Sequence, residues 1–287
     1  MHKRIVDVAL DDIQRPNLLQ MMSLWSKANM LRYFGVSSCR FIAECQSSEK
    51  PRSVLTDLTM SDFGIEIKDW RRTYLNKNEP FLLEENLPSK DPFDIFDVWF
   101  KNVAEQADMS FEEVNAVCFS TAINNRPSSR MVLMKEYDRE GFSFYTNYES
   151  RKGKEILANP FASMLFYWPK ADRQIRIEGK VEKLSEEAAD NYWKTRPLKS
   201  RIGSKLSKQS TEIPSRQHLI SLRDSLQKLA DEKGLEAISR PTNWGGYRLR
   251  PDYFEFWQGQ SDRIHDRIVF IKTGDKKEGW TMKRLAP

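Results

Sequence analysis

The sequence predicts an α+β protein that is mainly β, in which short antiparallel strands form a barrel or sandwich with flanking helices. Strand-like runs rich in β-branched and aromatic residues follow one another between residues 116 and 184. Only short turn signals separate these runs, whereas parallel strands need a long crossover between them. The spacing therefore indicates antiparallel hairpins and argues against an alternating βαβ sheet.

The first predicted helix begins at Asp91-Pro92, where an N-cap residue precedes a first-turn proline. Its buried face is predicted from apolar residues at helical spacing, namely Phe96, Trp99, Phe100 and Val103. Strands are then predicted at Ala116–Ala122, Ser128–Glu136, Phe142–Tyr148, Phe161–Trp168 and Arg173–Leu184. The turn signals between them are Asn124-Asn125, Asp138 to Gly141, and Pro169 to Asp172.

The second half of the chain adds helices before the strands resume. A helical insert is predicted from Ser185 to about Thr195, and a longer helix from Pro214 to Lys233. The longer helix carries one apolar stripe and is closed by Gly234. The stripe consists of Leu219, Leu222, Leu226 and Leu229. Strands resume at about Gly246 and continue to the end of the chain.

The chain is predicted to consist of an N-terminal extension and a globular domain. Residues 1–65 are predicted as an N-terminal extension that is poorly ordered or packs separately. Helical apolar spacing runs through Leu18, Met21, Met22 and Trp25, but the period is lost from about residue 29. Residues 66–287 are predicted to form the globular domain, and a chain of 287 residues is long enough to bury a core.

Composition excludes several classes of protein. The net charge of +5 results from 46 basic and 41 acidic residues, a mild excess that does not indicate nucleic-acid binding. With 3 cysteines and 3 scattered histidines, no metal site can be proposed, and a reducing compartment is expected. No run is apolar enough to cross a membrane, and the N-terminus lacks a secretory signal. We expect a cytoplasmic protein, with import into an organelle left open.

Cations recur in groups, the first of them near the C-terminus. If the segment from Trp257 to Ile271 is one strand, Arg263, His265 and Arg267 project from one face, and Ile264 and Ile268 point toward a core. Three such groups in register suggest an anionic ligand. A solvated basic edge strand is an equally good interpretation of this stretch alone.

A second group of cations brackets a predicted strand at residues 128–136. Arg130 and Lys135 flank four apolar residues, so both faces of the strand are apolar, as in a central strand of a closed sheet. Cations at strand ends are also common and solvated, and that reading is favoured for this motif alone.

A third group lies where a strand ends and Ser150 can cap a helix. Arg151 and Lys152 then occupy the first turn, where cations oppose the helix dipole. A bound phosphate would resolve this conflict by accepting from the backbone N–H groups and both side chains. The chain has no Walker A or G-x-G-x-x-G pattern, so neither a P-loop nor a dinucleotide fold is indicated.

A fourth group surrounds a predicted helix break at Pro197. Tyr192 and Arg196 share a helical face, and Ser200 follows the break, so a phenol, a guanidinium and a hydroxyl could clamp an oxyanion. Gln209-Ser210 adds further donors downstream. A helix end with ordinary surface cations is the alternative for this group in isolation.

Taken together, these segments resemble the pyridoxine (pyridoxamine) 5′-phosphate oxidase family. The likeness runs in order from about Trp70 to the C-terminus, whereas the first sixty residues depart from the family pattern. The matching motifs include Arg130–Lys135, Phe144–Lys154, Asn159–Phe161, Tyr167-Trp168, Arg173–Gly179, Tyr192–Gly203, Gln209-Ser210, Trp244–Tyr247, Glu255–Gln260, Arg263–Arg267 and Arg284–Pro287.

The resemblance implies an FMN-binding split β-barrel, a homodimer with FMN at the subunit interface, and no metal. It implies that FMN is contacted by Arg130, Met131, Val132, Leu133, Tyr145, Thr146, Arg151, Lys152, Gln174, Gln209, Ser210, Trp257 and Arg267. It implies that the substrate phosphate is bound by Lys135, Tyr192, Arg196 and Ser200. Arg263 and His265 would face the pyridine ring as the catalytic pair, and the segment Arg71 to Tyr74 would close over the substrate.

The implied reaction oxidises pyridoxine or pyridoxamine 5′-phosphate to pyridoxal 5′-phosphate, with O2 reduced to H2O2. Whether His265 is a base or only orients the ring stays open at this point, as does the preference for alcohol or amine. One alternative is a flavin- or haem-binding split-barrel protein without oxidase activity. Another is a nucleic-acid-binding module that combines basic patches with aromatic rings.

Overall fold

The computed structural model describes residues 68, 74, 82–107, 113–274 and 279–287. From residue 74 onward these residues belong to one compact unit, Asp69–Pro287. The predicted N-terminal extension lies outside the described residues, so its boundary at residue 65 stays a prediction. Within the described part of the chain, no helix is long and apolar enough to span a membrane.

A nine-stranded antiparallel sheet forms the framework, in the order β2-β1-β5-β6-β7-β4-β3, with β8 pairing with β7 and β9 with β8. Its strands are β1 (Ala116–Ile123), β2 (Arg126–Leu133), β3 (Glu136–Asp138), β4 (Gly141–Asn147), β5 (Phe161–Trp168), β6 (Arg173–Lys183), β7 (Trp244–Gln258), β8 (Asp266–Lys272) and β9 (Trp280–Arg284). The prediction of an antiparallel, mainly β protein is confirmed. The hydrogen-bonded path is open at β2 and β3, so the pairing by itself does not close a barrel.

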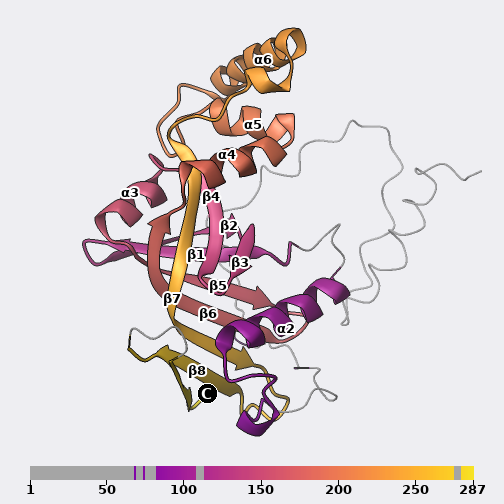
Figure 1. Cartoon of the computed structure of the whole chain (residues 1–287), viewed down its shortest axis with the longest axis vertical. Helices are drawn as coiled ribbons and strands as arrows, with labels where there is room; N and C mark the ends of the chain where they lie inside the picture. The colour runs from indigo at the N-terminus through magenta and orange to yellow at the C-terminus, as the bar shows by residue number, and fades with distance from the viewer. Residues whose placement is uncertain (1–67, 69–73, 75–81, 108–112, 275–278) are drawn as a thin grey trace, which may run out of the picture. The chain divides into compact units, whose positions relative to one another are not determined.

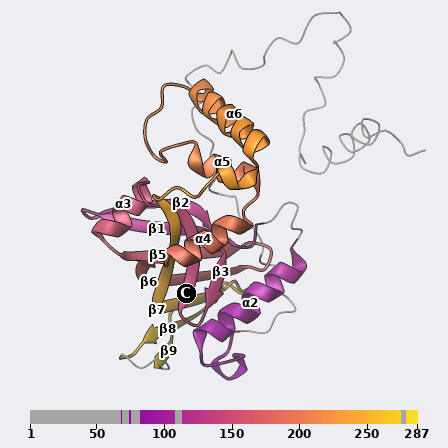
Figure 2. The same ribbon diagram turned by 45° about the horizontal axis from the view of Figure 1, so that its top comes forward.

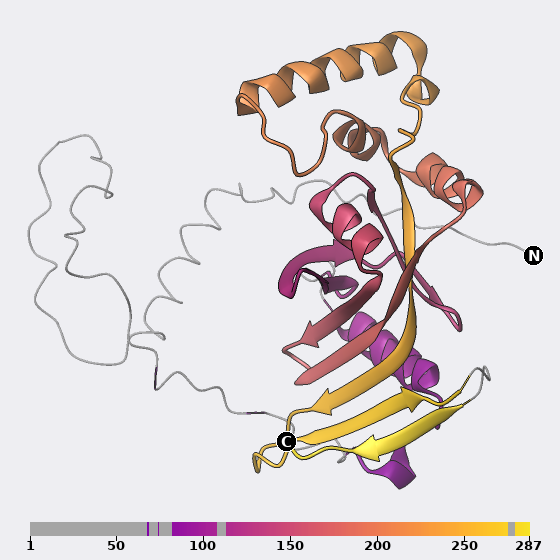
Figure 3. The same ribbon diagram turned by 90° about the vertical axis from the view of Figure 1, so that its left-hand side faces the viewer.

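The 15-residue strand β7 pairs with three other strands of the sheet. Its first part pairs with β4 and its last part with β8, while β6 runs along its other edge. The ladder with β6 is irregular between Glu178 and Gly179. A Cβ on Gly179 would lie 2.0 Å from the carbonyl oxygen of Arg250, so only glycine fits this close approach. Figure 3 shows β7, β8 and β9 side by side.

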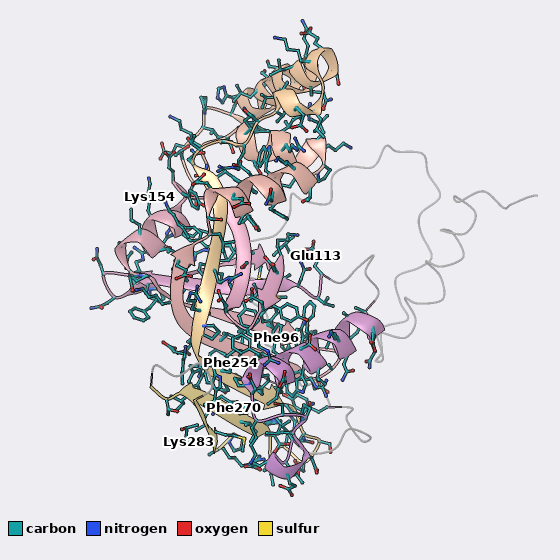
Figure 4. All side chains as sticks on the ribbon, in the orientation of Figure 1. Phe96, Glu113, Lys154, Phe254, Phe270 and Lys283 are labelled. Atoms are coloured by element: carbon teal, nitrogen blue, oxygen red, sulfur yellow. The ribbon has the colours of Figure 1, made fainter. Side chains whose placement is uncertain are left out.

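Helix α2 (Pro92–Gln106) covers part of the main core. The Asp91 carboxylate accepts from the backbone N–H of Phe93 at 2.8 Å, which confirms the predicted N-cap. Phe96 and Trp99 are buried in a cluster rich in aromatic rings that also contains Phe254. Figure 4 labels Phe96 on α2 and Phe254 on β7, which belong to this same cluster. Each fully buried phenylalanine contributes roughly 1.5–3 kcal/mol.

A second, smaller core lies where β7 begins. It is built from α4 (Glu186–Thr195), α5 (Leu198–Lys205), α6 (Arg216–Lys233) and the start of β7. Trp193, Ile202 and Trp244 are buried there, and Leu226 and Leu229 of the predicted stripe pack against them. Figures 1 and 2 show these helices together at one end of β7, with β8 at its other end in Figure 1. Short 3-10 helices, η2 (Glu84–Asn86) and η3 (Leu235–Ala237), complete the description.

The hairpin between β1 and β2 turns at Asn124 and Asn125, as predicted. Both residues have positive φ, 51° and 60°, which asparagine tolerates and a two-residue hairpin requires. The predicted role of the second strand is wrong, however. Strand β2 is at one end of the hydrogen-bonded path and Met131 is 63% exposed, so it is not a central strand with two covered faces.

Candidate functional site

A cavity of about 610 Å³ lies between β2, β4, α3 (Arg151–Ala158) and α4. It gathers most of the residues for which the sequence predicts a ligand-binding role. Those predicted to contact the cofactor are Arg130, Met131, Val132, Leu133, Tyr145, Thr146, Arg151, Lys152, Gln209 and Ser210. Those predicted to bind the substrate are Lys135, Tyr192 and Arg196. We call this space the first cavity.

Arg130 enters the first cavity from β2 and is held by strand β1 beside it. Its guanidinium donates to the Phe119 carbonyl at 3.2 Å and to Thr121 Oγ1 at 2.7 Å. It also bonds to Ser128 Oγ and forms an ion pair with Glu155 at 2.8 Å. Because so many partners hold this side chain, its orientation is preset before any ligand arrives.

The first turn of α3 supplies two more cations, as the sequence predicts. Ser150 caps the helix by accepting from the backbone N–H of Gly153. Arg151 is 58% exposed and its Nε donates to Glu155 at 2.8 Å. A Cβ at position 153 would lie 2.0 Å from the carbonyl oxygen of Tyr148, so glycine lets the chain turn tightly into this helix.

Lys152 is buried beneath the first cavity. Its Nζ donates to Thr146 Oγ1 at 3.1 Å and approaches Gln209 Oε1 at 3.4 Å. Burial and, to a smaller extent, the neighbouring Arg130 charge lower the pKa of Lys152 to about 8, although the Glu155 charge offsets part of the shift. A buried ammonium with neutral partners favours a site that receives an anion.

The other end of the first cavity is formed by α4. Tyr192 stacks on Tyr145 with 3.9 Å between ring centroids, and the Arg196 guanidinium lies over the Trp244 ring at 4.6 Å. Burial raises the pKa of Tyr192, and Arg196 partly offsets this effect. Arg196 donates to the Ser200 carbonyl at 2.9 Å, so Ser200 lies beside the cavity although its side chain does not line it.

Arg196 also carries an unused donor. Among the described residues, its Nε is the buried side-chain nitrogen or oxygen for which the structure shows no hydrogen-bond partner. Leaving a buried donor unpaired is costly, so native structures rarely keep one without a reason. The unpaired donor belongs to a side chain that lines the first cavity.

Arg201 fixes the helix break next to this clamp. It is 1% exposed, and its guanidinium donates to the carbonyls of Lys194 at 2.8 Å and Arg196 at 3.1 Å. These are backbone groups that a helix leaves unpaired at its C-terminal end. The predicted stop before Pro197 is thus confirmed, and a buried arginine that the sequence analysis did not single out stabilises it.

The remaining predicted residues form a second group elsewhere on the sheet. Gln174 and Trp257 are paired across β6 and β7, and with Tyr74 they line a cavity of about 290 Å³. Arg267 on β8 is paired with Trp257 of β7 and forms an ion pair with Glu255 at 2.8 Å. The first cavity is lined by none of this second group, and the 290 Å³ cavity is lined by none of the residues of the first cavity.

The predicted single strand through Arg263, His265 and Arg267 is wrong. Strand β7 ends at Gln258 and β8 begins at Asp266, so Arg263 and His265 lie in the connecting loop. Arg263 has a φ of 71°, a left-handed conformation that a strand does not contain. Ile264, predicted to face a core, is 68% exposed, whereas Ile268 is fully buried as predicted.

The loop nevertheless brings its cations to the second group. The His265 ring lies 4.9 Å from the Tyr74 ring and 5.0 Å from the Trp257 ring. The Arg263 guanidinium lies over the Tyr74 ring at 5.2 Å. Arg71, predicted to act with Tyr74, lies outside the described residues. In the described part of the chain, no group of acidic, histidine or cysteine side chains is arranged to hold a metal ion.

Two family models match this chain. Residues 103–221 match the family described as pyridoxamine 5′-phosphate oxidase. Residues 244–287 match the pyridoxine 5′-phosphate oxidase C-terminal dimerisation region.

Similar proteins cover most of the chain. A Caenorhabditis elegans protein that carries the family's name is 57% identical over 225 residues, covering 78% of this chain and 98% of its own length. The pyridoxine-5′-phosphate oxidase of Bos taurus is 42% identical over 253 residues, covering 84% of this chain and 94% of that protein.

A solved structure is also similar. It is PhzG from Burkholderia lata in complex with tetrahydrophenazine-1-carboxylic acid, with 30% identity and a TM-score of 0.66, and it covers 73% of this chain and 98% of PhzG. With relatives of this identity matched over nearly their full length, the chain belongs to the pyridoxamine 5′-phosphate oxidase family.

Proposed function

We propose that this chain oxidises pyridoxine 5′-phosphate and pyridoxamine 5′-phosphate to pyridoxal 5′-phosphate, using FMN as cofactor and O2 as the final acceptor. The observation that carries the proposal is the first cavity, which collects two separate sets of cations. Both FMN and the substrate bear a phosphate dianion. One cavity with two anion clamps therefore suits this pair of ligands.

The residues present fit both phosphates. Arg130, Arg151 and Lys152 converge at the start of α3 and would hold the FMN phosphate. Lys135, Tyr192 and Arg196, beside Ser200, would hold the substrate phosphate, with the unpaired Arg196 Nε as one donor. Each charge-assisted contact contributes roughly 1.5–3 kcal/mol, enough for several to anchor a small polar ligand.

We further propose that the complete site forms between two copies of the chain in a split-barrel homodimer. Trp257, Arg263, His265 and Arg267 lie within the range that matches the dimerisation region. They line a different part of the sheet from the first cavity. A twofold interface presents the same surface on both copies, so the second group of one copy can lie against the first cavity of the other.

In this proposal the protein supplies geometry and charge. Arg130, Arg151 and Lys152 would hold FMN, which would supply the two-electron acceptor for the substrate carbon that becomes the aldehyde. An alcohol would lose a hydride and its hydroxyl proton, whereas an amine would lose a hydride and an N–H proton and water would then release ammonia from the imine. O2 would take up the two electrons and two protons as H2O2. Clamping the substrate phosphate restricts the pyridine ring to one orientation, which lowers the barrier by limiting its motion. Arg263 and His265 would orient the ring from its other side.

The hydrogen bonding of His265 favours an orienting role over a role as base. The backbone N–H of Gln260 donates to His265 Nδ1 at 3.0 Å. A nitrogen that accepts carries no proton, so the neutral ring holds its proton on Nε2. His265 therefore presents a donor to the substrate.

The test is direct. The purified protein should be yellow and should form pyridoxal 5′-phosphate and H2O2 in air from pyridoxine 5′-phosphate, measured by absorbance and a coupled peroxidase assay. Unphosphorylated pyridoxine should be a poor substrate, as should tetrahydrophenazine-1-carboxylic acid, which lacks a phosphate. A yellow protein without turnover would favour a flavin-binding protein, and a colourless one with salt-sensitive RNA affinity would favour a nucleic-acid module.

Binding of FMN should weaken as the pH rises above about 8. The pKa of Lys152 is lowered to about 8, so above this pH the side chain is largely neutral before the ligand binds. Binding a dianion then requires proton uptake, and the dissociation constant should rise by up to about tenfold per pH unit. Quenching of flavin fluorescence between pH 7 and 9 measures this effect. A Lys152→Gln variant should bind more weakly with a flatter pH profile, and an unchanged profile would contradict the role of Lys152.

A further inference from the structure

Glu155 is a buried carboxylate that lies behind the first cavity without lining it. It is on α3 and is 4% exposed. Its oxygens accept from Thr121 at 2.6 Å on β1 and from Ser128 at 2.9 Å on β2. It also accepts from Arg130 at 2.8 Å and from Arg151 at 2.8 Å. One side chain thus ties both arginines of the proposed FMN clamp to two strands and a helix.

The ionised state of this carboxylate is strongly favoured. Burial alone would raise the pKa of Glu155, but the hydrogen bonds from Thr121, Arg151, Ser128 and Arg130 outweigh burial and lower it to about 2. Glu155 is therefore a full negative charge at every pH at which the protein works. It stands next to a site proposed to bind a dianion.

On charge alone, this placement opposes ligand binding. A carboxylate close to a phosphate repels it, and the repulsion is larger where water is scarce. Glu155 also partly neutralises the two guanidiniums that should attract the ligand. The arrangement is therefore unfavourable for affinity unless the carboxylate contributes something other than charge.

Glu155 can instead contribute by fixing the positions of the two arginine side chains. A guanidinium on a long side chain loses rotamer freedom when it binds, and fixing it beforehand removes this cost. Glu155 engages Arg130 through Nη2 and Arg151 through Nε. Protein acceptors already use both Nη groups of Arg130, so its Nε–H is left for a ligand, whereas Arg151 keeps both of its Nη groups. We infer that Glu155 is a positioning residue that preorganises Arg130 and Arg151 for the FMN phosphate, an inference that rests on the proposed function.

The two explanations predict opposite signs for Glu155→Gln. This change keeps the shape of the side chain and removes one negative charge from the neighbourhood of the ligand. If charge dominates, FMN should bind more tightly. If positioning dominates, the FMN dissociation constant should rise by about tenfold or more. Arg130 and Arg151 bond to different oxygens of Glu155, and glutamine replaces one of these acceptors by an NH2 group, so one of the two arginines loses its partner. Riboflavin, which lacks the phosphate, should bind the variant and the unmodified protein equally well.

A matched control is Glu149→Gln. Glu149 is exposed, precedes the same helix, and accepts from Asn243 at 2.9 Å without contacting either arginine. Glu149→Gln removes one negative charge close to the same helix terminus but leaves the contacts of Arg130 and Arg151 intact, so FMN affinity should change little. Titrations of flavin fluorescence on the full chain, well below each variant's melting temperature, give both dissociation constants without relying on turnover.

The outcomes separate the inference from the function on which it rests. If the unmodified protein fails to bind FMN, the proposed function is wrong. If it binds FMN and Glu155→Gln binds FMN as tightly or more tightly, the positioning role is overturned while the function stands. Equal losses for FMN and riboflavin would also overturn it, since they would indicate a general structural effect. If Glu155→Gln does not fold, Glu155→Asp decides, because it keeps the charge and withdraws the acceptor, and it too should weaken FMN selectively.

Discussion

Replacing Arg196 by alanine is expected to raise the KM for pyridoxine 5′-phosphate by about 10- to 150-fold while FMN stays bound, the loss equivalent to one charge-assisted contact. The guanidinium lies over Trp244 and donates to Ser200 and Ser204, which leaves Nε directed to no partner in the described structure. The proposed FMN clamp around α3 does not include this residue. Steady-state kinetics with FMN in excess, together with the flavin content of the purified variant, measures both quantities.

Two further variants separate binding from packing. Arg196→Met keeps an apolar stem over Trp244 and removes the charge, so it should retain stability but show the same rise in KM. Lys194→Ala removes a cation from the same helix outside the first cavity, and its KM should not change. If Arg196→Ala instead loses its flavin and keeps its KM, the two phosphate sites have been assigned the wrong way round.

Much of the fold could be predicted because its signals are local. Three of these signals are the caps at Asp91 and Ser150 and the helix stop at Gly234. Each of them depends only on residues within one turn of its own helix end. Strand β5 has the predicted bounds, Phe161–Trp168, because alternation and flanking turn residues define it within the segment itself. Such signals do not depend on how distant parts of the chain pack.

The incorrect predictions concern residues whose burial is determined by tertiary contacts. Ile264 has the character of a core residue, yet it lies in a loop whose backbone is set by Arg263 in a left-handed conformation and by the bond from Gln260 to His265. Met131 is apolar on what proved to be an end strand with an exposed face. Neither outcome is encoded in periodicity, because neighbouring strands and partner surfaces determine which apolar residues are covered.

The same limit applies to the site. Motifs indicated which cations matter, but not that they divide into the first cavity and the second group. The sequence analysis does not include Glu155, and its i, i+4 spacing from Arg151 is typical of an ordinary solvated helix pair. Its partners Thr121 and Ser128 come from strands more than twenty residues away in sequence, so only the fold reveals the buried network.

Combining two impaired variants in one dimer is expected to restore activity, measured at a substrate concentration far below the raised KM of Arg196→Ala, if the site is shared between subunits. Arg196→Ala damages the first cavity, and Arg263→Ala damages the second group; each homodimer then carries a defect in both of its sites. In a heterodimer, one site combines both defects, while the other combines the intact first cavity of one subunit with the intact second group of its partner. Heterodimers should therefore have about half the activity of the unmodified dimer, because one of two equivalent sites is intact.

Co-expression with two different affinity tags and sequential purification isolates the heterodimer for this measurement. Activity should exceed that of either homodimer by far, since each homodimer lacks a complete site. The control is a heterodimer of Arg196→Ala with Lys135→Ala: both residues line the first cavity, so each site carries one defect wherever the second group comes from. That pair should stay inactive. If the Arg196→Ala and Arg263→Ala pair is equally inactive while remaining dimeric and folded, each site lies within one chain, and the loop carrying Arg263 and His265 does not act across the interface.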